Sequence, residues 1–216
     1  MPTPDSTPER DYAASRRLLA RVARLLYDRR LTELQGGNMS LRTGNVAVVT
    51  PTKASENNGW SLAPEDILVQ DLTGHVLLGD PARISRETAL HVRLYREFAD
   101  IGSVFHLHLP EAIGAVAAGR WAPGVVTATP DEFGAALVVL EPGLPAQTEQ
   151  HDGRVGELMA QVSRAGGAIS ISPGHGVFSV APDVATNVRV ADVFRQRMEY
   201  ERLRGRLRFA RSRGRS

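Results

Sequence analysis

Apolar side chains near the start of the chain recur at helical spacing. Arginines separate these apolar residues: Leu18, Leu19, Val22, Leu25 and Leu26. Residues three or four positions apart share one face of a helix, so the pattern predicts an amphipathic helix over residues 11–30. We expect the apolar face of this helix to cover a hydrophobic core.

Two pairs of short apolar-rich stretches follow, and a glycine-containing turn joins the members of each pair. The first pair covers residues 39–42 and 46–50, and the second covers residues 67–71 and 75–78. Apolar stretches joined in this way are typical of antiparallel hairpins. The sequence therefore predicts two hairpins in the first half of the chain.

Helical and strand patterns are interleaved in the remainder of the chain. The predicted helices cover residues 85–98, 110–118, 153–164 and 182–204, and the predicted strands cover residues 103–109, 137–140, 168–171 and 176–180. We expect Ser85 to cap the first of these helices. Because neither a repeat nor a linker divides the chain, we predict one α/β (α+β) domain over residues 11–204, between a disordered lead (1–10) and a basic tail (205–216).

Composition narrows the possible classes of protein and of site. The 216 residues are 42% hydrophobic and 23% charged, without a long apolar run, which excludes a disordered chain and a membrane-spanning helix. The absence of cysteine excludes a disulfide scaffold, a zinc–thiolate site and a cysteine nucleophile, and leaves histidine and carboxylate as metal ligands. The first ten residues lack the features of a secretory signal, which predicts a cytoplasmic location.

The end of the chain is strongly basic. Residues 201–216 carry seven arginines and one glutamate, a charge pattern that can bind nucleic acid or an acidic partner. However, Lys53 is the only lysine among the 26 basic residues, so arginine is the usual solvated cation of this chain. Because no aromatic platform or docking motif accompanies the tail, we expect no nucleic-acid partner, and we expect catalysis to survive loss of the tail.

Three histidines are candidates for a metal site. His106 and His108 lie two residues apart in a predicted strand, where side chains alternate, so both project from one face. His175 lies in a glycine-containing turn that can direct its side chain into a cleft. Three imidazoles with an open position are typical of catalytic zinc, although a histidine pair on a strand is more often structural.

A carboxylate stands close to these histidines in the sequence. Glu87 lies at the start of the predicted helix that precedes the histidine strand, where the helix dipole favours its ionised form. It is either a helix-capping acid or a general base beside a metal. His91 lies four residues later on the same helix face, and we interpret it as a packing residue.

The order of these motifs resembles the class II aldolase/adducin family. The resemblance runs from about Leu18 to Tyr200 and rests on five fragments: Gly37-Asn38-Met39-Ser40, Thr50-Pro51-Thr52, Ser85-Arg86-Glu87 with His91 and Tyr95, His106-Leu107-His108, and His175-Gly176. It implies zinc held by His106, His108 and His175, with Glu87 as the acid/base. It also implies a three-layer fold with a central, mostly antiparallel sheet, and a homotetramer with sites at subunit boundaries.

The resemblance also implies an anion site for the substrate. The corresponding positions here are Gly37, Asn38, Thr52, Lys53, Ser85 and Arg86. Backbone N–H groups in glycine turns and at a helix start form a natural cradle for an anion. Lys53 replaces the family's usual glycine and Arg86 its usual second serine, so the bound group is either a phosphate or a carboxylate.

The family's chemistry leaves several reactions open. The resemblance implies a zinc-dependent lyase that cleaves a ketose by reversible aldol chemistry through an enediolate. By the same resemblance, this ketose is expected to carry a phosphate group, as the substrates of the family's sugar-phosphate enzymes do. The alternatives are a dehydratase, an epimerase or a non-catalytic, adducin-like interaction module. No tyrosine lies between Trp121 and Leu140, where the aldolases supply one. The epimerases carry aspartate in place of Glu87, and the non-catalytic relatives have typically lost the metal ligands.

Overall fold

The computed structural model describes residues 12–34, 36–119, 124–127, 136–139, 153 and 167–213. The described strands are β1 (Asn38–Thr43), β2 (Val46–Val49), β3 (Leu68–Asp71), β4 (Val76–Leu78), β5 (Ser103–Leu107), β6 (Gly124–Thr127), β7 (Ala136–Val139), β8 (Ala168–Ser172) and β9 (Gly176–Ala181). The described α-helices are α2 (Ala13–Asp28), α3 (Ala54–Asn58), α4 (Thr88–Glu97), α5 (Pro110–Ala117) and α7 (Val184–Arg213). A 3-10 turn, η1 (Pro64–Asp66), lies between α3 and β3, and a second, η2 (Pro81–Arg83), lies between β4 and α4.

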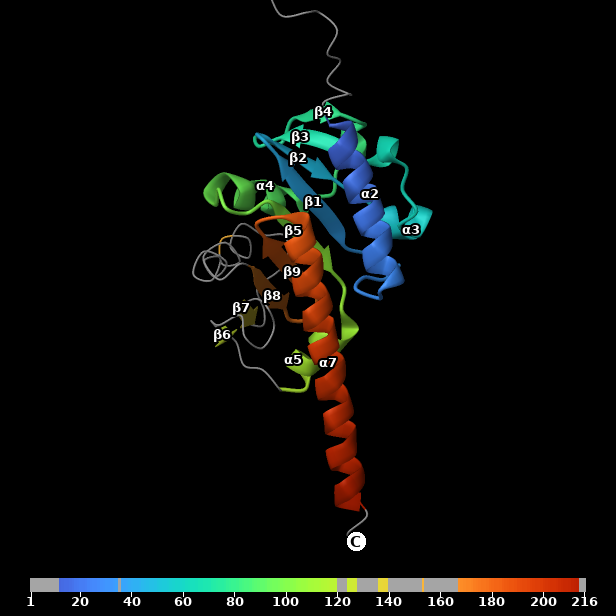
Figure 1. The fold of residues 1–216 in the computed structure, drawn as a ribbon, viewed down its shortest axis with the longest axis vertical. Coiled ribbons are helices and arrows are strands. Elements are labelled where there is room, and N and C mark those ends of the chain that lie inside the picture. Colours follow the sequence, from blue (N-terminus) through green and yellow to red (C-terminus); the bar gives the residue numbers. More distant parts are fainter. Residues whose placement is uncertain are drawn as a thin grey trace, which may run out of the picture.

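The described strands form one nine-stranded sheet in the order β4-β3-β2-β1-β5-β9-β8-β7-β6. Neighbouring strands run antiparallel, apart from the parallel pair β7 and β8. Figure 1 shows this sheet crossing the molecule behind α2 and α7. The mixed, mostly antiparallel architecture predicted from the sequence is confirmed.

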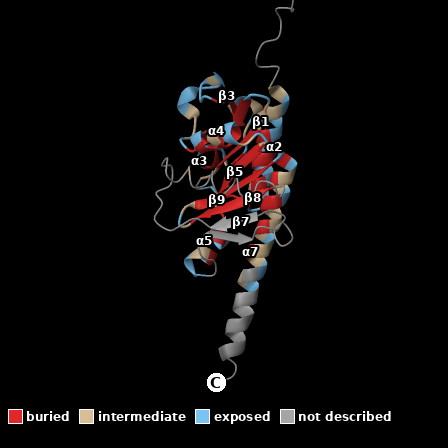
Figure 2. Ribbon diagram, turned by 90° about the vertical axis from the view of Figure 1, so that its left-hand side faces the viewer, coloured by how far each residue is buried: buried red, intermediate tan, exposed pale blue. Residues whose placement is uncertain are grey.

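Successive side chains of the central strands point to opposite faces of the sheet, and a hydrophobic cluster forms on each face. On one face, Met39 and Phe105 pack with residues of α2, α5 and α7. On the other face, Val104 and Phe178 pack with residues of α4, among them Leu90. Figure 2 shows the buried strands between these helices, so the fold has three layers.

Both predicted hairpins are confirmed, as β1–β2 and β3–β4. Two helix boundaries are wrong. The helix expected from Ser85 begins at Thr88, so the N-cap position is Glu87 and not Ser85. Ser85 lies in the preceding turn, where its carbonyl accepts the Thr88 N–H. The final helix continues to Arg213, well past residue 204. The predicted lead over residues 1–10 lies outside the described residues, as do all residues but the first of the helix predicted over 153–164.

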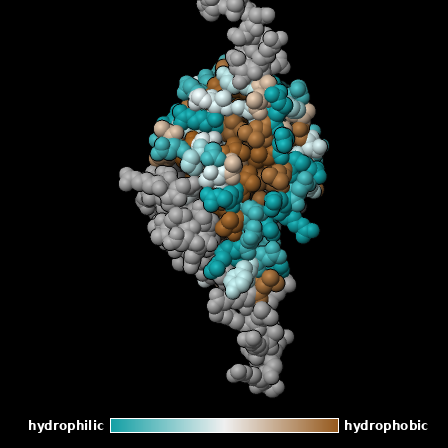
Figure 3. All heavy atoms as spheres, viewed as in Figure 1, coloured by the Kyte–Doolittle hydropathy of each residue, from teal (hydrophilic) through white to brown (hydrophobic). Residues whose placement is uncertain are grey.

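The expectation that all five apolar residues of the first helix cover the core is wrong for two of them. Leu19 and Leu26 are buried, whereas Leu18 is 47% exposed and Leu25 is 41% exposed. Each exposed leucine precedes a buried one, and one residue turns a helix by about 100°. Figure 3 shows the resulting apolar surface over α2. Among the described helices, none has the length and apolar character that crossing a bilayer requires.

Candidate metal and acid–base site

The site begins with a row of side chains across three neighbouring strands. Asn38 on β1 lies opposite His106 on β5, and His106 lies opposite Phe178 on β9. All three point to the α4 face, since Met39 and Phe105 occupy the other one. The Phe178 ring stacks on the His106 ring with centroids 4.4 Å apart, which helps to fix the imidazole plane.

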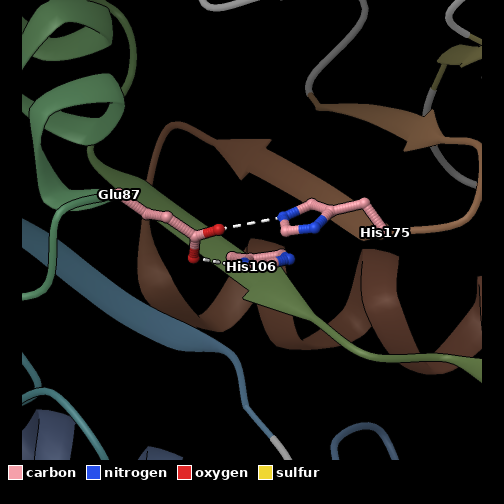
Figure 4. Close-up of side chains that lie close together, drawn as sticks. All are labelled: Glu87, His106 and His175. Atoms are coloured by element: carbon pink, nitrogen blue, oxygen red, sulfur yellow. Dashed lines mark hydrogen bonds and ion pairs between the residues drawn. The ribbon is translucent and has the colours of Figure 1, made fainter. Parts of the chain in front are cut away.

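Glu87 reaches this row from the residue just before α4. Its Oε2 lies 2.5 Å from His106 Nδ1, and its Oε1 lies 2.9 Å from His175 Nε2. Asn38 Nδ2 donates a hydrogen bond to the same Oε2. Figure 4 shows the carboxylate pointing at both imidazoles, with His175 carried by the turn between β8 and β9. Because the carboxylate is engaged here, it makes no capping bond, and the capping interpretation of Glu87 is wrong.

The donor atoms of this cluster fit a divalent metal ion. One ligand atom from each of Glu87, His106 and His175 lies within 4.8 Å of the others. Imidazole nitrogen and carboxylate oxygen are donors that zinc accepts. A Cβ at Gly176 would lie 2.5 Å from His106 Nε2, so the glycine leaves space for this ring. The residues present therefore fit a metal that binds nitrogen and oxygen.

His108 stands at the edge of the same cluster. Its ring centroid lies 5.0 Å from that of His106 and 6.1 Å from that of His175, so the three predicted imidazoles are neighbours. The group of donor atoms that lie within 4.8 Å of one another, however, contains Glu87 in place of His108. Its Nδ1 lies 3.7 Å from Glu33 Oε1. Burial, and secondly the nearby His106 and His175, lower the pKa of His108, which favours the neutral imidazole that metals bind. At Gly36, where φ is +147°, a Cβ would lie 2.5 Å from the His108 ring.

A buried polar network supports the helix that follows Glu87. Ser40 Oγ lies 2.8 Å from His91 Nδ1 and 2.6 Å from the Tyr95 hydroxyl. Burial is the main reason why the pKa of His91 falls to about 3, so this imidazole is neutral at physiological pH. These contacts agree with the interpretation of His91 as a packing residue.

The six residues predicted to bind an anion make different contacts in the structure. Asn38 belongs to the Glu87 cluster, and Gly37 precedes it with φ +93°, where a Cβ would lie 2.8 Å from the His106 carbonyl oxygen. Thr52 donates its backbone N–H to the Arg83 carbonyl, and Lys53, with φ +56°, precedes α3. The last two, Ser85 and Arg86, line a separate hollow beside α4.

Sequence reasoning missed three contacts of the site. It assigned Asn38 to anion binding and did not anticipate its bond to Glu87, and it did not single out Phe178 or Glu33. The pairing of Asn38 with His106 joins positions 68 residues apart. The register of β1 with β5 is the signal that would have placed Asn38 beside His106, and the register of β5 with β9 is the one that would have placed Phe178 there.

Comparison with known proteins identifies the family of this chain. Residues 17–201 match the family described as Class II Aldolase and Adducin N-terminal domain. An L-fuculose phosphate aldolase of Methanococcus maripaludis is 38% identical over 88 residues, which cover 41% of this chain and 46% of that protein. A methylthioribulose-1-phosphate dehydratase of Sorangium cellulosum is 37% identical over 90 residues, which cover 42% of each chain. The matches thus span about half the length of these curated relatives.

Solved structures show the same fold over most of the chain. An L-fuculose 1-phosphate aldolase aligns with a TM-score of 0.71 and 19% identity, covering 89% of this chain and 86% of that chain. The L-fuculose-1-phosphate aldolase of Thermus thermophilus aligns with a TM-score of 0.63 and 22% identity, covering 91% of this chain and 97% of that chain. With the family match extending over residues 17–201, the chain belongs to the class II aldolase and adducin N-terminal domain family.

Proposed function

We propose that this chain is a metal-dependent lyase that acts on a sugar phosphate, with reversible aldol cleavage through an enediolate as its reaction. One observation carries the proposal: the Glu87 carboxylate lies between the imidazoles of His106 and His175, at 2.5 and 2.9 Å. A base within reach of metal-binding imidazoles suits removal of a proton next to a carbonyl group. The aldolase named among the relatives supports the substrate class.

The histidines have the task of holding the metal. We assign His106, His108 and His175 as its ligands, and zinc as the ion that their nitrogen donors favour. When bound, the ion supplies a positive charge that polarises the carbonyl and adjacent hydroxyl oxygens of the substrate. Gly176 and Phe178 keep the His106 ring in place, because one leaves room for it and the other stacks on it.

Glu87 has the task of moving the proton. Asn38 donates to its Oε2, which fixes the carboxylate and leaves Oε1 on the side of His175. The Glu87 side chain is only 9% exposed, so bulk water has little access to the proton that it takes up. The carboxylate thus accepts a proton from substrate carbon and returns one to the product.

Anion recognition by the turn before β1 is part of the same proposal. Gly37 and Asn38 place the start of the strand beside the cluster, and Lys53 and Thr52 supply a cation and a hydroxyl in the next loop. Ser85 and Arg86 belong to the predicted set as well, and they directly precede Glu87 in the chain. A phosphate or a carboxylate satisfies these donors.

Dehydration is the second candidate reaction. One curated relative is named a methylthioribulose-1-phosphate dehydratase, and loss of a β-hydroxyl group from the same enediolate gives that outcome. The lack of a tyrosine between Trp121 and Leu140 also favours this alternative over carbon–carbon cleavage. Glu87 acts on the same carbon, next to the carbonyl, in both reactions: it removes a proton there before dehydration, and it returns a proton there to the enediolate after carbon–carbon cleavage.

A panel of phosphorylated and unphosphorylated ketoses, with identification of products, tests the proposal. We expect a phosphorylated ketose to yield two shorter carbonyl compounds after addition of zinc. A single dehydrated product supports the dehydratase instead. If no ketose is converted by protein that contains stoichiometric metal, the lyase proposal fails and an adducin-like interaction module is favoured.

The homotetramer and the cytoplasmic location stay predictions. Exposed Leu18 and Leu25 on α2 give the described surface an apolar patch of the kind that subunit interfaces cover. Light scattering of the purified protein measures the molar mass directly. A mass four times that of the 23.4 kDa chain supports the tetramer, and a mass equal to that of the chain contradicts it.

A further inference from the structure

Glu33 lies beside His108, the one predicted metal ligand that the cluster of donor atoms does not include. Its Oε1 is 3.7 Å from Nδ1 of His108, and both side chains line a hollow of about 620 Å³ at the edge of the metal site. The donor atoms that lie within 4.8 Å of one another belong to Glu87, His106 and His175. His108 is thus a ligand whose orientation needs support from outside the cluster.

The backbone that carries Glu33 is anchored to the core. The indole Nε1 of Trp60 donates a hydrogen bond to the carbonyl oxygen of Glu33 at 2.9 Å, and Trp60 itself is fully buried. The two preceding residues, Leu31 and Thr32, are 0% and 5% exposed. The Glu33 side chain, in contrast, is 42% exposed. The carboxylate therefore extends toward His108 from a fixed point of the backbone.

Gly36 closes a second side of the His108 ring. A Cβ at Gly36 would lie 2.5 Å from Cε1 of His108, so this backbone is in close contact with the ring edge between the two nitrogens. The φ of Gly36 is +147°, a conformation that side chains disfavour. Because Glu33 faces Nδ1, Nε2 is the nitrogen that His108 retains for a metal.

A carboxylate at this nitrogen determines what the imidazole offers to a metal. A neutral imidazole has one N–H, and an acceptor beside Nδ1 favours the tautomer that is protonated there. The lone pair is then on Nε2, and the carboxylate fixes the ring and makes the imidazole a stronger donor. The separation of 3.7 Å exceeds that of a direct hydrogen bond, about 2.9–3.0 Å, and the exposed Glu33 side chain has the freedom to shorten it.

We propose that Glu33 is a positioning residue for His108: it accepts a hydrogen bond from Nδ1–H and so keeps the lone pair of Nε2 available to the metal. The inference rests on the proposed role of His108 as a metal ligand. Trp60 and Gly36 belong to the same arrangement, because the first holds the Glu33 backbone and the second leaves room for the ring. The task of Glu33 is separate from that of Glu87, which moves the substrate proton.

Competition with a chromophoric chelator measures the zinc affinity of the full-length protein. Glu33→Leu removes the acceptor at similar volume, and the affinity should fall about tenfold, as on loss of an outer partner of a metal-bound histidine. Glu33→Gln keeps an acceptor oxygen and should recover part of the loss. The matched control is Glu111→Leu, which should stay within about twofold of wild type. Glu111 lines the same hollow and makes no ion pair or hydrogen bond in the part of the chain that the structure describes.

A second measurement needs no metal. Proton–nitrogen correlation NMR of the imidazole rings in the metal-free protein shows which nitrogen carries the proton, and the spectrum of His108→Gln assigns the signal. We expect the Nδ1–H form at His108 in the wild type and in Glu111→Leu, and a shift toward the Nε2–H form in Glu33→Leu. A purely structural role of Glu33 would lower the melting temperature of the metal-free protein and leave this tautomer unchanged.

Three results would overturn the proposal. The first is a zinc affinity of Glu33→Leu within about twofold of wild type. The second is an equal loss in Glu111→Leu, which would show a general effect of negative charge near the metal. The third is an unchanged His108 tautomer in Glu33→Leu. In each case the wild type still binds zinc, so the proposed metal site stands, whereas a wild type that binds no zinc contradicts the proposed function and the positioning role together.

Discussion

Strands β1 and β5 present different chemistry on the two faces of the sheet. Under α2 and α7, Met39 and Phe105 are fully buried in an apolar cluster. Under α4, the adjacent positions Asn38 and His106 bond to Glu87. The same strands thus pack into an apolar cluster on one face and carry the candidate site beside a second apolar cluster on the other, because successive side chains alternate. Substitutions on the two faces should therefore separate loss of fold from loss of activity.

The largest expected effect is on activity. Glu87→Gln removes the base and keeps the side-chain volume, so turnover should fall about 10²- to 10⁴-fold, while bound metal is retained. Steady-state kinetics and metal analysis measure both quantities. The control is Glu97→Gln, at the exposed end of α4, which should leave turnover unchanged. Near-normal turnover of Glu87→Gln would remove this residue from the mechanism.

On the apolar face, the effect should be on stability. Phe105→Ala empties a fully buried position, so the free energy of unfolding should fall by about 3–5 kcal/mol. Urea denaturation monitored by circular dichroism gives this value. Phe98→Ala, at the half-buried end of α4, is the comparison and should cost less. A loss below about 1 kcal/mol for Phe105→Ala would contradict the assigned core.

The polar network under α4 should make stability depend on pH. The pKa of His91 is about 3 in the folded protein, below its ordinary value of 6.5, mainly because of burial. The unfolded chain therefore binds the proton first, and stability falls as pH drops from 6.5 towards 3. The loss through this group is about 3 kcal/mol by pH 4. In His91→Gln, denaturation curves between pH 7 and pH 4 should lose this part of the slope, and an unchanged slope would contradict it.

The smallest expected effect lies on the outer surface of the apolar layer. Leu25→Gln changes an exposed residue of α2 and should alter the free energy of unfolding by about 0.5 kcal/mol or less. Its neighbour Leu26 is fully buried, and Leu26→Ala should cost about 2–5 kcal/mol. Thermal and urea unfolding compare the two variants. Equal losses would show that Leu25 is covered in solution.

Local patterns were sufficient to predict most of the elements. Apolar stretches around glycine turns identified both hairpins, and leucine spacing identified α2. The start of α4 was misplaced at Ser85 because capping preference is local, whereas the Glu87 carboxylate is engaged by His106 and His175 across the fold. Similarly, spacing alone did not distinguish exposed Leu18 from the buried face of α2.

The sequence predicted only those residues of the candidate site that belong to short, recognisable motifs. Glu87 and the three histidines were singled out from their residue types, and the structure places them together. The role of Glu87 as the base and the role of the histidines as metal ligands stay proposals. Asn38 and Phe178 needed the register of three strands, which sequence spacing does not contain.

The most direct test of the account is the metal content of the purified protein after zinc is supplied and excess is removed. The account predicts about one equivalent per chain by mass spectrometry, and a large loss in His106→Ala and His175→Ala, compared with His75→Ala on the exposed β3–β4 turn. A wild-type content below about a tenth of an equivalent would contradict it.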